Sequence, residues 1–260
     1  MNTLERIVVL IDADNTRFRK LELILQEIST RGRIVVKRAY GNWKKDNLKN
    51  WEEELKRLAI KPEQQFDYVT GKNATDMALV IDAIELLHSS IYDGFVLVSS
   101  DSDYTPLSIK LHESGVYVIG VGEHKTPVSF RNSCDEFVFL ENLNSAESSQ
   151  EEEDAALPPA DAAVAVAEAP HSNEESTSKP DSLQVVHALL RKAWETYQDE
   201  DEFVNVSSAG TYIKRVKPDF DVRSFGYSKL PKLIEGCPDM YDIKKFRGKG
   251  TVTIFAYKCK

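Results

Sequence analysis

Two groups of acidic side chains each follow a short apolar run. Asp12 and Asp14 come directly after RIVVLI, and Asp101 and Asp103 come directly after FVLVSS. If both runs are parallel strands, their carboxyl ends meet at one edge of the sheet, where ligands bind in open α/β folds. Crowded carboxylates repel one another unless a cation neutralises them, and hard divalent cations prefer oxygen ligands. This spacing predicts a site for Mg²⁺ or Mn²⁺.

A third acidic group lies where a loop enters a predicted helix, in GKNATDMALVIDAIEL. Asp76 falls in the first turn and can face the same edge, whereas Asp82, about 600° further round the helix, points elsewhere. We therefore predict Asp12, Asp76, Asp101 and Asp103 as metal ligands and catalytic residues. Any one of them alone is equally explained as a helix cap or a turn residue, and only their convergence favours a metal site.

A divalent cation held by such a cluster activates water, orients it in line with a phosphodiester and stabilises the departing oxyanion. Asn15 and Ser99 lie at the same strand ends, where they either contact water or phosphate or simply form turns. Among the nearby cations we select Arg38 and Lys72 as contacts to a phosphate backbone. Trp43, beside two lysines, is placed either to stack a base or to pack in the core, and core packing is favoured.

These residues require a sheet that brings distant strands together. Short β-branched runs alternate with amphipathic helical stretches over residues 1–141, the pattern of a parallel sheet covered by helices on both faces. The sequence thus predicts a Rossmann-like α/β fold. We expect strands at 6–11, 33–40, 65–69, 94–99, 116–120 and 136–140, and helices near 18–30, 47–59, 74–89 and 105–114.

Residues 142–180 are rich in Ala, Glu, Ser and Pro and are predicted to be a disordered acidic linker. The negative charge is concentrated there: residues 141–179 carry −9, against −3 for residues 1–140 and +3 for residues 180–260. Residues 181–260 predict a small α+β winged-helix-like domain, with helices near 183–197, 208–216 and 228–235 and a hairpin around RGKG. Lys214, Arg215 and Lys245 are its predicted phosphate contacts, and Tyr227 is a candidate for stacking on a base.

The 260-residue chain contains only three cysteines, and their spacing matches neither a zinc site nor a disulfide framework. A reducing, cytoplasmic location is therefore expected. The N-terminal stretch predicts no signal peptide, and the weakly polar segment 155–170 is interrupted by proline and acidic residues, far from the roughly 20 apolar residues of a membrane span. We expect a soluble protein with no membrane partner.

The motifs IDADN, RAYGNW, GKNATDMALVIDA and SSDSDYTPL occur in this order, and through them residues 6–141 resemble the bacterial branch of the NYN family of PIN-like nucleases. The resemblance implies metal-dependent RNA cleavage, with the family's acidic positions falling on Asp12, Asp76, Asp101 and Asp103. Ser100 departs from the pattern, because many members carry glycine there, and its side chain is expected to narrow the approach of substrate.

The second domain is similar to the LOTUS domain, also called OST-HTH, over residues 181–258. That resemblance implies binding of RNA, single-stranded or structured and including G-rich RNA, or alternatively a protein-docking role. The natural RNA, the endo- or exonucleolytic mode and the oligomeric state, for which a homodimer is one option, stay open.

Two other functions fit parts of the same sequence. The residues from Asp12 to Thr16 also match the DxDxT nucleophile motif of haloacid dehalogenase-type phosphatases. Against that function, no lysine lies between Lys72 and Lys110 to steady a phospho-aspartate. A non-catalytic protein that binds RNA and recruits partners is the second alternative, because ligands for a metal do not guarantee turnover.

Overall fold

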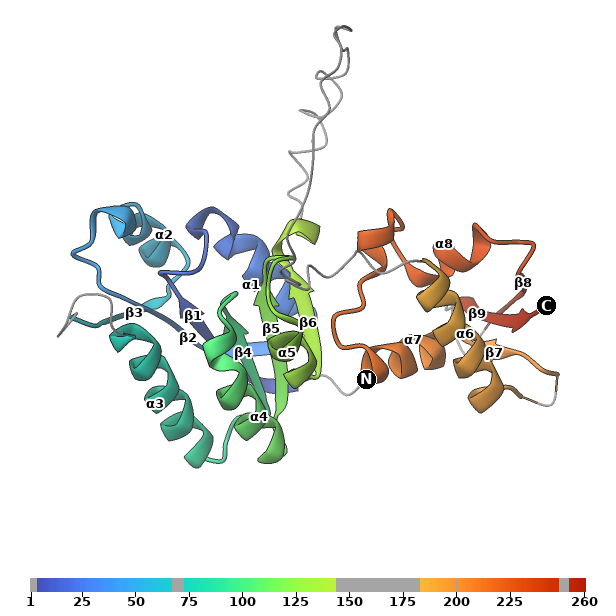
Figure 1. The fold of residues 1–260 in the computed structure, drawn as a ribbon, viewed down its shortest axis with the longest axis horizontal. Coiled ribbons are helices and arrows are strands. Elements are labelled where there is room, and N and C mark those ends of the chain that lie inside the picture. Colours follow the sequence, from blue (N-terminus) through green and yellow to red (C-terminus); the bar gives the residue numbers. More distant parts are fainter. Residues whose placement is uncertain (1–3, 67–72, 144–182, 200, 248–252) are drawn as a thin grey trace, which may run out of the picture.

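The computed structural model describes residues 4–66, 73–143, 183–199, 201–247 and 253–260. Two folded parts lie side by side, an N-terminal α/β domain and a smaller C-terminal domain (Figure 1). Within the described residues, no helix is long and apolar enough to cross a membrane.

The N-terminal domain is built on a parallel sheet with the order β3-β2-β1-β4-β5-β6. Its strands are β1 (Leu4–Asp12), β2 (Gly32–Gly41), β3 (Lys61–Gln64), β4 (Gly94–Val98), β5 (Tyr117–Gly122) and β6 (Glu136–Phe139). Strand order reverses between β1 and β4, which pair directly with each other. The crevice at such a reversal is where open α/β sheets bind ligands, and the predicted acidic residues follow β1 and β4, the two strands that flank it.

Helices cover both faces of this sheet, as predicted (Figure 1). Side chains alternate along β1, so that Val9 and Ile11 face one apolar core while Val8 and Leu10 face the other. The first core contains side chains from α1 (Leu21–Ser29) and α2 (Trp51–Arg57), and the second contains those from α3 (Ala74–His88), α4 (Thr105–Glu113) and α5 (Val128–Ser133). Short 3-10 turns precede α1, α2 and α4, at Phe18–Lys20, Asp46–Leu48 and Ser102–Tyr104.

The third strand is shifted from its predicted position. It spans Lys61–Gln64, whereas the apolar pattern predicted residues 65–69, of which 67–69 lie outside the described residues. This strand pairs only with β2, at the edge of the sheet, where a polar sequence and Pro62 are tolerated. The six-residue helix α5 was also not predicted, because one and a half turns carry no readable periodicity.

The C-terminal domain has its own apolar core and the predicted winged-helix-like arrangement. Its elements are α6 (Leu183–Tyr197), β7 (Val204–Asn205), α7 (Val206–Val216), a 3-10 turn η5 (Val222–Phe225), α8 (Leu230–Glu235), β8 (Tyr241–Arg247) and β9 (Thr253–Cys259). The strands form an antiparallel sheet in the order β7-β9-β8. Of the predicted linker, residues 144–180 lie outside the described part of the chain, and Asn142 and Leu143 complete the N-terminal domain.

Candidate active site at the carboxyl edge of the sheet

Asp12, the last residue of β1, is fully buried and stands at the centre of the acidic group. One carboxylate oxygen, Oδ1, accepts a hydrogen bond from the backbone N–H of Asp14 at 3.1 Å. The other, Oδ2, accepts from Asn15 Nδ2 at 2.8 Å and from Ser99 Oγ at 2.9 Å. The structure therefore brings three predicted site residues, Asp12, Asn15 and Ser99, into direct contact.

Burial raises the pKa of Asp12 to about 6, and only the hydrogen bonds from Asn15 and Ser99 oppose that rise. The negative charges of Asp76 and Asp14 raise it further. This carboxylate is thus held in a place where its charge is poorly compensated by the protein alone. A bound cation would favour the ionised form.

Asp76 lies in the first turn of α3 and accepts a hydrogen bond from the Tyr104 hydroxyl at 2.7 Å. Partial burial raises its pKa, and so do the nearby charges of Asp101, Asp14 and Asp103. The acids predicted from three separate segments therefore share one electrostatic environment.

Asp101 and Asp103 follow β4. Asp101 caps the short 3-10 turn, because its Oδ1 accepts from the backbone N–H of Asp103 at 2.9 Å, and its own N–H donates to Ser99 Oγ at 3.1 Å. Asp103 is exposed at the rim and accepts from Asn73 Nδ2 at 3.2 Å. Capping, the structural role considered for these acids, occupies one oxygen of Asp101.

The donor set suits a hard cation, because the four predicted ligands offer only carboxylate oxygens. Among the described lysines and arginines, none forms an ion pair with any of the four; Lys45 approaches Asp14 instead, at 3.5 Å. Nor do any three described His, Cys, Asp or Glu side chains stand in position to enclose an ion by themselves. Mg²⁺ does not require this, since it usually takes one or two carboxylates and keeps several waters.

One predicted phosphate contact, Arg38, does not join this group. Arg38 is engaged by Asp82, with Nη1 at 2.5 and 2.6 Å from its two carboxylate oxygens, and the Tyr40 hydroxyl donates to the same carboxylate. This cluster also accounts for Asp82, which was predicted to point away from the acidic edge. Lys72 lies outside the described residues.

Two neighbouring side chains have structural partners. Trp43 packs against Trp51, with ring centroids 5.9 Å apart, as part of the first apolar core. Core packing, the favoured alternative for Trp43, is the one that the structure shows. The Ser100 hydroxyl accepts from the backbone N–H of Glu123 at 2.9 Å, so it ties the loops after β4 and β5 together.

The basic residues selected in the C-terminal domain have different surroundings. Lys214 pairs with Glu136 of the N-terminal domain at 2.6 Å, and Lys245 pairs with Glu235 at 2.5 Å and lies over the Phe255 ring. Arg215 is exposed. Tyr227 is half-buried and packs against the core of its own domain.

Sequence reasoning did not select Tyr104 and Asn73, although both hydrogen-bond to predicted ligands. Asn73 stands at the residue before α3, a position that favours Asn, so a capping signal was available there. Tyr104 gave no such signal, because a tyrosine after SDSD equally fits the apolar core that holds its ring.

Comparison with known proteins gives two family matches. The model of the NYN domain matches residues 6–141, and the model of the OST-HTH/LOTUS domain matches residues 178–253. A crystal structure of a Vibrio parahaemolyticus protein of unknown function is similar to 54% of this chain, over 94% of its own length, with 18% identity and a TM-score of 0.45. No curated protein matches the sequence significantly.

Proposed function

We propose that this chain, which belongs to the NYN domain family and also carries an OST-HTH/LOTUS domain, is a metal-dependent ribonuclease that hydrolyses RNA phosphodiester bonds. NYN domains are PIN-like nuclease domains, and the LOTUS domain suggests RNA binding. The observation that supports the proposal is the electrostatic interaction of Asp76 with Asp12, and of Asp76 with Asp101 and Asp103, in a sheet whose strand order reverses beside β1. No described cationic side chain pairs with Asp12, Asp76, Asp101 or Asp103 there.

Asp12, Asp76, Asp101 and Asp103 would hold Mg²⁺ or Mn²⁺, which supplies an activated water and stabilises charge on the departing oxygen. The side chains around these acids fix their orientation. Asn15 and Ser99 hold Asp12 Oδ2, and the Tyr104 hydroxyl holds Asp76. Asp103 is exposed at the rim and accepts a hydrogen bond from Asn73 Nδ2.

The substrate is RNA because the second domain belongs to a class that suggests RNA binding, and Arg215, exposed on α7, is one contact for the phosphate backbone. Cytoplasmic action is consistent with three cysteines that are all free. A non-catalytic RNA-binding adaptor is the outcome left if turnover fails.

The test is cleavage of a mixed single-stranded and structured RNA pool by purified protein with Mn²⁺. We expect cleavage that a chelator abolishes and that Asp101→Asn reduces by about 10⁴-fold or more, the order seen when a central catalytic group is lost. Asp46→Asn is the matched control, since this aspartate is 89% exposed in its side chain and pairs only with Lys49 among the described residues. Equal cleavage by Asp101→Asn and wild type would rule out this site.

The phosphatase alternative has its own test. It requires a phospho-enzyme on Asp12, and a beryllofluoride adduct on that carboxylate would favour it over the nuclease. We expect no such adduct, because no lysine lies between Lys72 and Lys110 to steady a phospho-aspartate.

A further inference from the structure

The outer edge of β6 is covered by the C-terminal domain. β6 is the last strand of the sheet, yet Glu136, Phe137, Val138 and Phe139 are all buried, at 3, 2, 2 and 5% exposure. A free strand edge presents unpaired N–H and C=O groups and invites association. Here the backbone N–H of Phe137 donates to the carbonyl oxygen of Pro218 at 2.9 Å. The two domains therefore continue each other's hydrogen bonding at this edge.

A buried ion pair crosses the same boundary. Arg131 Nη1, on α5, lies 2.6 Å from Asp219 Oδ2 in the C-terminal domain, and both side chains are less than a tenth exposed. Charges are buried at a high cost unless they are paired and hydrogen-bonded. Each of these two residues obtains its closest opposite charge only when the domains are in contact.

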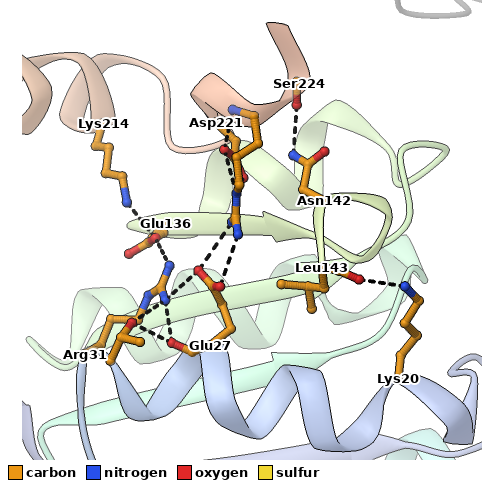
Figure 2. A network of polar contacts seen from close by, with 11 residues as sticks. Lys20, Glu27, Arg31, Glu136, Asn142, Leu143, Lys214, Asp221 and Ser224 are labelled. Atoms are coloured by element: carbon orange, nitrogen blue, oxygen red, sulfur yellow. Dashed lines mark hydrogen bonds and ion pairs between the residues drawn. The ribbon is translucent and has the colours of Figure 1, made fainter. Parts of the chain in front are cut away.

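A second shared carboxylate is Glu136, which lies between Arg31 of its own domain and Lys214 of α7 (Figure 2). Its Oε1 is 2.7 Å from Arg31 Nη2 and 2.6 Å from Lys214 Nζ. Burial by itself would raise the pKa of Glu136, but the charge of Lys214 and the hydrogen bond and charge of Arg31 outweigh it and hold the pKa below its ordinary value. The carboxylate is therefore fully charged and fully compensated.

A third set of contacts extends from this network toward the carboxyl end of β6. Arg223 bonds to Glu27 of α1 at 3.1 and 3.3 Å and to Asp221 of its own domain. Asn142 Nδ2, just after β6, donates to Ser224 Oγ at 2.9 Å (Figure 2). The contacts thus extend along the whole strand and do not depend on one side chain.

We infer that Lys214, Pro218, Asp219, Arg223 and Ser224 form a docking surface by which the C-terminal domain binds the β6 edge, so that the domains stay associated without the covalent link between them. The basic end of α7 then serves domain binding through Lys214, while Arg215 stays exposed for other partners. This inference is independent of the proposed nuclease activity.

Docking also fixes where the second domain stands relative to the acidic edge. Asn142 follows the carboxyl end of β6, on the same side of the parallel sheet as Asp12 at the end of β1. Its contact with Ser224 therefore sets η5, and with it α8, on the side of the molecule where the strands end (Figure 1).

The experiment uses the full chain with a specific protease site inserted between residues 150 and 170. After cleavage, the mixture is passed over a sizing column at about 1 μM, far below the millimolar effective concentration that a short tether supplies. We expect the two halves to co-elute. Separation of two halves that both keep their far-ultraviolet circular dichroism would overturn the inference.

Two substitutions at the interface test how much each contact contributes to the affinity between the halves, and a third substitution outside it is the control. Arg131→Asp replaces the buried cation with a like charge facing Asp219, and we expect the affinity between the halves to fall by at least about a hundredfold. Lys214→Ala should weaken it less, because Arg31 still compensates Glu136. Lys244→Ala removes a charge that pairs with Asp201 within the C-terminal domain, and co-elution should be unchanged.

A thermal melt of each cleaved variant checks that both halves are still folded. If Arg131→Asp co-elutes as wild type does while both halves are folded, the docking surface is assigned to the wrong residues.

Discussion

Asp12 and Glu136 are both buried carboxylates, at 0 and 3% exposure, yet their environments act in opposite directions. Burial raises the pKa of each, but around Asp12 the neighbours that oppose the rise are neutral, Asn15 and Ser99, and further carboxylates add to it. Around Glu136 the neighbours are Lys214 and Arg31, and the pKa falls below its ordinary value. Burial of an acid therefore says little until its partners are identified.

The difference separates a binding site from a structural contact. At the interface each charge finds its counter-charge within the protein, as Glu27 and Asp221 do with Arg223. At the acidic edge no described lysine or arginine pairs with Asp12, Asp76, Asp101 or Asp103, and in the proposed function a bound cation would compensate them. Perturbed acids of the second kind mark functional sites.

The largest effect is expected when the positive charge of Arg131, which compensates Asp219 at the domain interface, is removed. Arg131→Leu leaves Asp219 buried with only Lys217 at 3.4 Å, and breaking a buried pair typically costs about 3–5 kcal/mol. We expect a loss of this order in the unfolding free energy of the intact chain, measured by urea denaturation. A loss below about 0.5 kcal/mol, the range of ordinary surface substitutions, would contradict the assignment.

The next largest effect is an increase in the unfolding free energy, and it is expected at Asp12 in the acidic edge. Because its folded-state pKa is about 6, above the ordinary 3.8, Asp12 stabilises the fold in its protonated form, fully below about pH 4, and this contribution is lost as pH rises through 6. In metal-free buffer, Asp12→Asn should therefore raise the unfolding free energy by up to about 3 kcal/mol at pH 8, and by little at pH 4.

The measurement is chemical unfolding of both proteins at several pH values with chelator present. Cleavage activity of Asp12→Asn should be lost at the same time. A stability difference that is equal at pH 4 and pH 8 would show that the ionisation of Asp12 is not responsible.

A smaller effect is expected at Tyr104, a positioning residue. Tyr104→Phe keeps the ring in the second core but removes its hydrogen bond to Asp76. That hydrogen bond lowers the pKa of Asp76, so the substitution should raise it. A hydrogen bond to a charged group contributes about 1.5–3 kcal/mol, so cleavage at neutral pH should fall about tenfold or more. The pH profile should move to higher pH; a uniform fall at every pH would indicate a packing defect instead.

The smallest effect is expected for an exposed ion pair, which serves as the comparison for the buried pair at the interface. Lys244 and Asp201 lie 2.8 Å apart with side chains 50 and 70% exposed. Water already compensates both charges, so Lys244→Ala should leave the urea midpoint unchanged. A clear drop would mean that exposed pairs contribute to stability here, and the contrast with Arg131 would weaken.

The sequence by itself determined which acids lie at the carboxyl edge of the sheet. Apolar runs with acids at their ends predict strands whose carboxyl ends share an edge, and Asp12 and Asp101 followed from that rule. Asp76 followed from its place in the first turn of a predicted helix. The helices on both faces followed from periodicity. The polar edge strand β3 and the short helix α5 did not, because neither carries a distinctive pattern.

Only the tertiary structure decided the partners of the charged side chains. Lys214 has the same local sequence signal as any exposed lysine on a helix, and its partner Glu136 is 78 residues away. Likewise Arg38 forms an ion pair with Asp82, 44 residues further along the chain and away from the acidic edge. Local sequence fixes which face of an element a side chain occupies, but a counter-charge depends on which distant element packs there. That is settled only when the chain is folded.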